Sequence, residues 1–268
     1  GFKRFNSSYF VTSGVCRWTD TVLSRPAATL GAGTRLACAF TSSESDCWLP
    51  MSTSAPSLPV TLSHALEAAV TAAHAGAGVL QAYAHNRADL VIDTKARNDL
   101  VSQADREAEV AILDILRERT PEFGIVAEES GGTATGIASW YIDPLDGTTN
   151  FLHGIPHYAV SIALVEKAGT HLPPGEVLTE DTPILGVVYD PQREELFTAV
   201  AGGGAWLNGH RIRVSRSTGL DASVLATGFS CRDFSFVDEY MPMFNDAMQS
   251  TRGVRRMGSA ALDLAWTA

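Results

Sequence analysis

One fourteen-residue stretch, from Trp140 to His153, constrains the fold of this chain more than any other part of the sequence. Two carboxylates, Asp143 and Asp146, end an apolar run there, and a Gly-Thr-Thr-Asn turn follows at once. Carboxylates beside a tight glycine turn suit a hard divalent cation, which prefers oxygen ligands. Backbone N–H groups that open a helical turn suit an anion such as phosphate. The stretch therefore predicts a cation site beside an anion site, as metal-assisted phosphate chemistry requires.

Length and charge narrow the classes of protein to which the chain can belong. Its 268 residues are enough for one large domain or two small ones with a sizeable core. The formal net charge of −10 argues against nucleic acid as the main partner, because phosphate backbones select basic surfaces. An acidic protein that acts on a phosphate ester would need metal ions to offset repulsion at the site. No apolar run reaches the roughly 18 residues that span a bilayer, so we expect no membrane association.

The first 58 residues differ from the rest and predict a disordered N-terminal extension outside the fold. They are rich in Ser, Thr and Ala and show no sustained period. Two interpretations remain open: a basic transit peptide, which would indicate a plastid, or non-native upstream sequence with Met51 as the true start, which would indicate the cytoplasm. The four cysteines show neither zinc nor disulfide spacing, which favours an intracellular protein. We further expect an α+β metal-binding domain at 59–215 and an incomplete α/β domain at 216–268.

Apolar spacing predicts alternating helices and short strands after residue 60. An antiparallel hairpin is expected around Asp190-Pro-Gln-Arg, because this turn joins two apolar runs. Predicted helices cover 62–83, 103–119, 236–248 and 260–266. Predicted strands cover 90–95, 125–127, 141–142, 158–165, 184–189, 195–200, 211–214 and 223–227.

Acidic residues gather at the ends of these predicted elements, and each also has an ordinary interpretation. Asp105 could be a helix N-cap, and Glu128 with Glu129 could be a solvated loop pair. Asp146 followed by Gly147 could form a hairpin turn, although the sequence after it lacks the period of a strand. Taken together, two strands end in carboxylates and a third carboxylate opens a helix. Like charges gathered at one sheet edge would need cations to stay ionised, which favours a metal site.

Four segments resemble the inositol monophosphatase family of Mg²⁺-dependent phosphatases. The most specific is Asp143-Pro-Leu-Asp-Gly-Thr-Thr-Asn-Phe, preceded by Ile125-Val-Ala-Glu-Glu-Ser and by Leu100-Val-Ser-Gln-Ala-Asp. A later segment, Gly253-Val-Arg-Arg-Met-Gly-Ser-Ala-Ala-Leu-Asp, is similar as well. The resemblance covers about residues 60–268. It implies a mixed α+β or α/β fold, layered α-β-α-β-α, and a homodimer.

The resemblance also implies roles for residues of the acidic cluster. Glu128, Asp143 and the backbone carbonyl of Leu145 would hold a first Mg²⁺. Asp143 would bridge to a second Mg²⁺ shared with Asp146, and a third, weaker ion would use Glu128 and waters. The family places a further second-ion ligand in a later Trp-Asp motif, which the 268 residues do not contain. We therefore expect this chain to bind the first ion and to turn over substrate poorly.

Catalytic and substrate-binding residues follow from the same resemblance. Asp105 and Thr148 would be catalytic, orienting the water that attacks phosphorus, with one metal lowering the pKa of that water. Backbone N–H groups of Gly147 and Thr148 would cradle the phosphate, and Asp146 would also contact the substrate.

Several nearby residues would have supporting or structural roles. Glu129 would support the metal ligands. Lys95 would lie in a mobile loop over the metals. His153 and His157 are expected to be structural, because hard Mg²⁺ sites rarely use histidine. Arg255-Arg256 could bind a substrate phosphate, or could equally be an exposed or helix-capping pair.

The substrate implied by the family is a small phosphorylated polyol, with inositol monophosphate as the default. A sugar phosphate, histidinol phosphate or a phosphonucleotide remains an alternative. The Thr148-Thr149 pair favours the inositol phosphate. An alternative of a different class is a catalytically impaired metal-binding chain.

Overall fold

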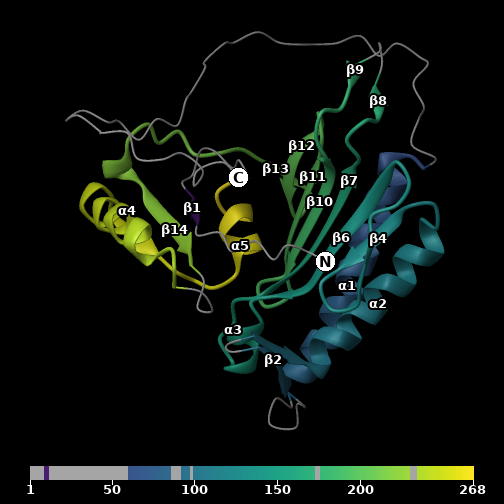
Figure 1. Cartoon of the computed structure of the whole chain (residues 1–268), viewed down its shortest axis with the longest axis horizontal. Coiled ribbons are helices and arrows are strands. Elements are labelled where there is room, and N and C mark those ends of the chain that lie inside the picture. Colours follow the sequence, from purple (N-terminus) through teal and green to yellow (C-terminus); the bar gives the residue numbers. More distant parts are fainter. Residues whose placement is uncertain (1–8, 12–59, 86–91, 97–98, 173–175, 230–233) are drawn as a thin grey trace.

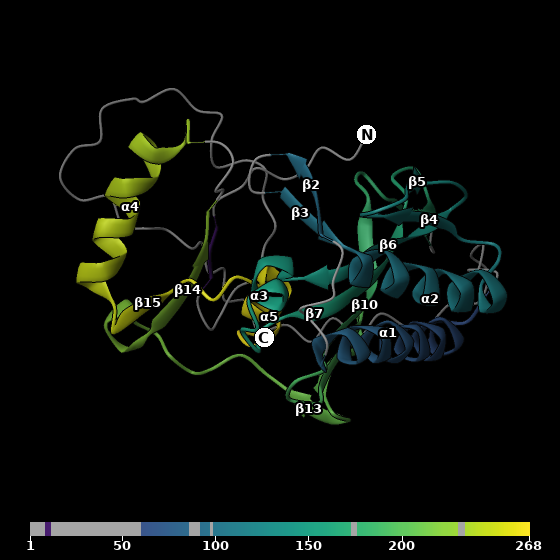
Figure 2. The same cartoon turned by 90° about the horizontal axis from the view of Figure 1, so that it is seen from below.

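The structure is a computed structural model that describes residues 9–11, 60–85, 92–96, 99–172, 176–229 and 234–268. Its elements form alternating layers in the order α-β-α-β-α (Figures 1 and 2). Two long helices, α1 (Leu62–His85) and α2 (Gln103–Arg119), form the first layer and cover one face of the main sheet. The layered α+β sandwich expected from the sequence is confirmed.

The two long helices pack closely because small side chains line α1. Its buried positions recur at helical spacing and are nearly all alanine, which brings the backbone of α1 close to α2. At Gly76 a Cβ atom would lie 2.7 Å from Ile112 Cδ1 on α2, so a side chain there would require Ile112 to move. The buried alanines of α1 are Ala65, Ala68, Ala69, Ala72, Ala73 and Ala77.

The main sheet has eight strands in the order β13-β12-β11-β10-β7-β6-β4-β5. Every neighbouring pair is antiparallel except β4 and β6, which run parallel with Ala127 opposite Ile142. The ends of these two parallel strands carry the predicted metal ligands. The strands are β4 (Gly124–Ala127), β5 (Gly131–Thr133), β6 (Ala138–Asp146), β7 (Ala159–Glu166), β10 (Thr182–Asp190), β11 (Glu195–Val200), β12 (Gly204–Leu207) and β13 (His210–Ile212).

The remaining layers lie on the other face of the main sheet. Short helices α3 (Thr148–Leu152) and α5 (Ala260–Ala265) form the middle layer, as Figures 1 and 2 show. A three-stranded sheet, β1-β14-β15, follows, and α4 (Val237–Ser250) lies outermost. Its strands are β1 (Tyr9–Val11), β14 (Val224–Gly228) and β15 (Gly253–Arg255). The other elements are β2 (Ile92–Ala96), β3 (Asp99–Ser102), β8 (His171–Leu172), β9 (Glu176–Val177) and a 3-10 turn at Leu220–Ala222.

Most elements predicted from apolar spacing are present, and the bounds of α2 are confirmed residue for residue. Several predicted bounds were wrong by one to four residues, as at β6, which runs from Ala138 to Asp146 and not only over 141–142. The glycine-rich segment before residue 209 contains strand β12, and the strand after it ends at Ile212, not at 214. Of residues 1–58 the structure describes only 9–11, and these pair with β14, although the sequence predicted an extension outside the fold. The division into three parts otherwise stays a prediction.

No helix within the described residues has both the length and the apolar character needed to cross a bilayer.

Candidate metal centre

Glu128 and Asp143 meet because their strands are parallel and in register. Each residue directly follows a register pair, Ala127 on β4 and Ile142 on β6. The Glu128 N–H donates to the Ile142 carbonyl at 3.1 Å, which ties the turn after β4 to β6. Glu128 lies close enough to Asp143 for its charge to raise the pKa of the Asp143 carboxyl group. Asp143 Oδ1 also accepts from the Leu145 N–H at 3.0 Å, and Glu128 is exposed, so the pair faces solvent on one side.

Asp146 contacts the start of α5. An irregularity in β6 between Asp143 and Asp146 breaks the strand alternation at the motif. Asp146 Oδ2 accepts from Ser259 Oγ at 2.5 Å and from the Ala261 N–H at 2.7 Å. A predicted metal ligand therefore also joins the main sheet to a helix more than 110 residues later in the chain.

Asp105 and Thr148, the predicted catalytic pair, lie side by side. Thr148 Oγ1 is 3.3 Å from Asp105 Oδ1 and 3.1 Å from the Leu145 carbonyl oxygen, so its single proton has two acceptors. The N-cap of α2 is Ser102, whose N–H and hydroxyl both donate to Asp105 Oδ2, at 2.9 and 2.5 Å. The N-cap interpretation of Asp105 was therefore wrong, because Asp105 occupies the third helical position of a capping box.

Gly147 begins a helical turn and not a hairpin. It is the N-cap of α3 and has a φ of 101°, a conformation that favours glycine. A Cβ atom there would lie 3.0 Å from the His157 carbonyl oxygen, so the turn also needs the absence of a side chain. The hairpin interpretation of Asp146-Gly147 is thus excluded. Backbone N–H groups of Gly147 and Thr148 lie at the start of α3.

Burial and mutual repulsion set the electrostatics of the cluster. Desolvation raises the pKa of Asp143 well above its usual range, and the charges of Glu128 and Asp146 raise it further. Desolvation also raises the pKa of Asp146, against the lowering effect of hydrogen bonds from Ser259 and the start of α5. Asp105 has a raised pKa through burial, although its hydrogen bonds with Ser102 lower it. The cluster therefore holds excess negative charge that a cation would offset.

The donor set fits a hard divalent cation such as Mg²⁺. All candidate donors are carboxylate or carbonyl oxygens, and Glu128 leaves one side open. Within the described part of the chain no three His, Cys, Asp or Glu side chains form a ready-made ion-binding group. Asp146 Oδ2 instead accepts hydrogen bonds from Ser259 and from the Ala261 N–H at the start of α5.

The structure adds one carboxylate that sequence reasoning missed. Glu109 lies on α2 four residues after Asp105 and is 2% exposed. Its carboxylate accepts from the Glu129 and Ser130 N–H groups, so it holds the turn that carries Glu128. The spacing of Asp105 and Glu109 on one helix face was the available signal.

The other predicted residues lie around the cluster. Lys95 belongs to strand β2, and its side chain lies outside the described part of the structure. His153 is exposed at the end of α3, whereas His157 is buried against Trp266, with ring centroids 5.2 Å apart. Arg256 lies over the Phe229 ring and donates to its carbonyl, and Arg255 donates to its neighbour Val254. The roles predicted for these residues stay predictions.

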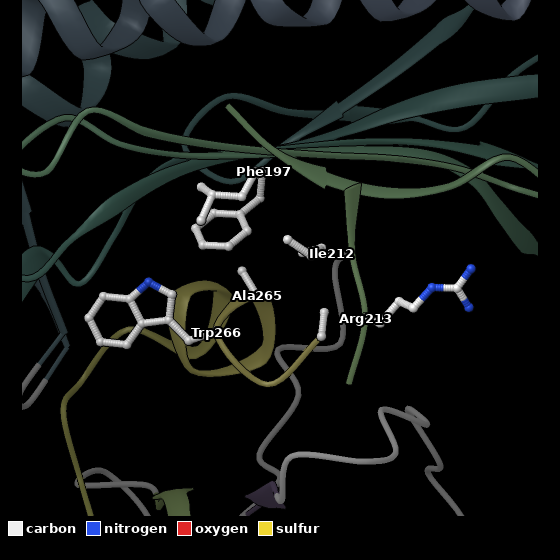
Figure 3. Close-up of a pocket in the computed structure, with 7 residues that line it drawn as sticks. Phe197, Ile212, Arg213, Ala265 and Trp266 are labelled. Atoms are coloured by element: carbon white, nitrogen blue, oxygen red, sulfur yellow. The ribbon is translucent and has the colours of Figure 1, made fainter. Parts of the chain in front are cut away.

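A separate apolar hollow lies between β11–β13 and the end of α5 (Figure 3). Its lining includes Phe197, Ile212, Ala265 and Trp266, and Arg213 points away from the others. None of the clustered carboxylates lines it. An apolar hollow without converging polar groups does not offer a site for phosphate.

Acidic residues at parallel strand ends beside a helical turn are the arrangement that metal-assisted phosphate chemistry would use. Residues 61–268 match the Inositol monophosphatase family, and the chain belongs to that family. It is 41% identical over 206 residues to "Nus factor SuhB" of Pasteurella multocida, covering 76% of this chain and 72% of that one. Several further relatives with this name are covered over only 61–62% of their length.

Solved structures agree with this assignment. The extragenic suppressor protein suhB from Bartonella henselae has a TM-score of 0.67 and 38% identity, over 76% of this chain and 74% of that one. The inositol monophosphatase from Anabaena (Nostoc) sp. PCC 7120 has a TM-score of 0.60 and 36% identity, over 78% and 72%.

Proposed function

We propose that this chain is the metal-binding and catalytic part of an Mg²⁺-dependent phosphomonoesterase whose substrate is inositol monophosphate. The observation that carries the proposal is the placement of Glu128 and Asp143 directly after a register pair of two parallel strands, beside the Asp105–Thr148 pair. Glu128, Asp143 and the Leu145 carbonyl would hold the first ion, and Asp143 with Asp146 would contribute to a second. When bound, Mg²⁺ would lower the pKa of a water and offset the charge of the phosphate.

The protein groups would position the reactants around these ions. Thr148 Oγ1 lies between Asp105 Oδ1 and the Leu145 carbonyl, so a water that displaced either contact would be held by Thr148 and Asp105. The N–H groups at the start of α3 would bind phosphate oxygens, since this turn leaves backbone donors free of helical partners. Hydrolysis then needs no protein nucleophile and forms no covalent intermediate.

Inositol monophosphate is the default substrate because of the family and because the Anabaena neighbour is an inositol monophosphatase. A sugar bisphosphate, histidinol phosphate and a 3′-phosphonucleotide are the competing substrates. A panel of these four compounds, assayed for Mg²⁺-dependent phosphate release under equal conditions, ranks them. Inositol 1-phosphate is expected to give the highest kcat/KM. A higher kcat/KM for another compound would make that compound the proposed substrate in its place.

The test of the chemistry compares the chain with Asp143→Asn and with a matched control, Asp114→Asn. Asp114 is an exposed carboxylate on α2, so the control removes the same charge away from the cluster. Mg²⁺ binding measured by calorimetry and phosphate release are both expected to be lost only in Asp143→Asn. A wild-type chain that neither binds Mg²⁺ nor releases phosphate would overturn the proposal.

A second candidate function follows from the names of the relatives. Relatives 41–44% identical to this chain are named Nus factor SuhB, a name that does not describe a phosphatase. In this second candidate the chain binds a metal ion but does not hydrolyse a phosphate ester, and its task is the Nus factor role named for these relatives. Mg²⁺ binding without phosphate release from any compound of the panel would favour this candidate over the first.

A further inference from the structure

We infer that Glu109 is a positioning residue that holds the Glu128 turn in place for cation binding. This inference rests on the proposed function, since it assigns Glu109 a task at the same site. Glu109 touches neither the expected ion nor the substrate; it acts through the backbone of the turn that joins β4 to β5.

The contacts of Glu109 are bidentate and occupy both carboxylate oxygens. Oε2 accepts from the Glu129 N–H at 2.7 Å and Oε1 accepts from the Ser130 N–H at 2.8 Å. The carboxylate is 2% exposed, so water does not compete for these N–H groups from the helix side. Charge-assisted hydrogen bonds of this kind are about twice as strong as neutral ones. Two backbone N–H groups of the turn are therefore held by α2, in addition to the pairing of β4 with β5.

The two hydrogen bonds from the Glu129 and Ser130 N–H groups to Glu109 form a clamp on the turn. The position of Glu128 depends on this clamp, because the Glu128 side chain itself has little packing. Glu128 and Ser130 are exposed, and Glu129 is half-buried. The Glu128 N–H is tied to the Ile142 carbonyl on one side, and the next two N–H groups are tied to Glu109 on the other. A ligand on an exposed turn would otherwise have to be ordered when the ion binds, which weakens binding.

The same face of α2 holds two parts of the site. Asp105 and Glu109 are four residues apart and both are buried. Asp105 contacts Thr148 on α3, and Glu109 contacts the turn after β4. One rigid helix thus sets the distance between the expected catalytic pair and the expected ion ligands, a device that positions a site better than a free loop does.

The decisive variant is Glu109→Gln, which keeps the shape of the side chain. Only one of its two terminal atoms accepts, so its NH₂ group must face the N–H of Glu129 or of Ser130. The matched control is Glu107→Gln on the exposed face of the same helix, where the carboxylate accepts from Gln103 Nε2. Both variants remove one negative charge, so a general loss of attraction for cations is matched.

The first measurement is Mg²⁺ affinity by calorimetry, with Mn²⁺ as a second probe. Glu109→Gln is expected to raise the Kd about 10-fold, the lower end of the effect of supporting residues at metal sites, and Glu107→Gln to leave it within about 2-fold. Equal Kd values for Glu109→Gln and wild type would overturn the inference. Absence of Mg²⁺ and Mn²⁺ binding in the wild-type chain would overturn the proposed function instead.

The second measurement does not depend on the variant or on the ion. Amide hydrogen exchange of the wild-type chain reports the Glu129 and Ser130 N–H groups directly. The clamp predicts that both are protected at least 10-fold relative to an unstructured peptide, although the turn is exposed. Exchange of both amides at the unstructured rate, with β4 protected, would overturn the inference even if Glu109→Gln failed to fold.

Discussion

At the scale of single residues, Asp143 concentrates the electrostatic cost of the site. Its pKa is raised by desolvation first and then by Glu128 and Asp146, so the ion-free protein is less stable when this group is charged. Asp143→Asn is expected to stabilise the ion-free chain by about 1 kcal/mol at pH 7, as removal of functional strain commonly does. The measurement is thermal unfolding with and without Mg²⁺.

With Mg²⁺ the wild type should become more stable than Asp143→Asn, because only the wild type gains stability from binding the ion. Asp114→Asn, which removes an exposed charge on α2, should behave as the wild type in both conditions. A lower melting temperature for ion-free Asp143→Asn than for ion-free wild type would contradict the expected cost of the buried charge.

His157 belongs to the same scale and predicts a dependence on pH. Its side chain is 6% exposed, and its Nε2 has no hydrogen-bond partner among the described residues. Desolvation and the Arg193 charge lower its pKa from 6.5, against the opposing effect of Asp190. Below pH 6.5 the unfolded chain therefore binds a proton that the folded chain resists. The stability that the folded chain gains from keeping His157 neutral is fully present above pH 6.5. It is lost as the pH falls through the pKa of His157 in the folded chain.

His157→Phe removes this titration and keeps a ring against Trp266. Urea unfolding at pH 7.5 and 5.5 should show the wild type losing up to about 1 kcal/mol more than His157→Phe over this interval. Equal losses in the two proteins would show that His157 accepts its proton as readily in the folded chain as in the unfolded one.

Residue roles could be predicted only where neighbouring sequence carried the information. Asp143 and Glu128 follow apolar strands, so their meeting at one sheet edge was accessible from the pattern. Glu109 and Ser259 were not predicted to contact the site, because their partners lie 20 and 113 residues away. Such contacts depend on how distant elements pack together, and the spacing of residues within one segment does not indicate that packing.

At the scale of elements, the bounds of helices and strands could be predicted where the spacing of apolar residues was regular over the whole element. Helix α2 and strand β11 have the predicted bounds, since each has a long enough apolar pattern. Most of the strands that were missed have two or three residues, too few to show any period. Strands β3 and β12, with four residues each, were missed as well.

Two glycines of α1 give opposite predictions for one substitution. Gly78 is exposed and a Cβ there would meet nothing within 4 Å, so Gly78→Ala should stabilise the chain by about 0.5–1 kcal/mol through helix propensity. At Gly76 the same methyl would lie 2.7 Å from Ile112 Cδ1 and 2.8 Å from Cγ1. Overpacking of about 1–3 kcal/mol should exceed the helical gain, so Gly76→Ala should destabilise the chain.

Urea unfolding measures both substitutions through shifts of the midpoint at constant slope. Each variant serves as the control for the other, because both change glycine to alanine within the same helix. A midpoint for Gly76→Ala above that of the wild type would mean that Ile112 moves aside at little cost and that the helices are not in close contact there.

At the scale of the whole molecule, the layers are joined through the site. Asp146 ends strand β6 of the main sheet, and its carboxylate receives the N-terminus of α5 in the middle layer. The order of layers was predicted from the resemblance of motifs to a family, since periodicity alone indicated only helices outside an antiparallel hairpin. The hydrogen bonds from Ser259 and Ala261 to Asp146 form a joint between the two layers. This joint combines residues from distant segments, so composition and spacing could not reveal it.

Ser259 is the residue through which this joint can be tested. Its side chain is fully buried, donates to Asp146 Oδ2 at 2.5 Å and accepts from the Leu262 N–H at 3.3 Å as the N-cap of α5. Ser259→Ala removes a hydrogen bond to a carboxylate and a helix cap, so the chain should lose about 2–4 kcal/mol of stability. Ser250→Ala, at the exposed end of α4, is the control and should change stability by less than about 0.5 kcal/mol.

Hydrogen exchange separates loss of the joint from general loosening. In Ser259→Ala the amides of Ala261 and Leu262 should exchange faster, because their acceptors are Asp146 and Ser259. Helices α1 and α2, which pack on the opposite face of the sheet, should keep their protection. If α1 and α2 lost protection together with α5, the two faces of the sheet would unfold as one unit, and Asp146 would not act as a separable joint between the layers.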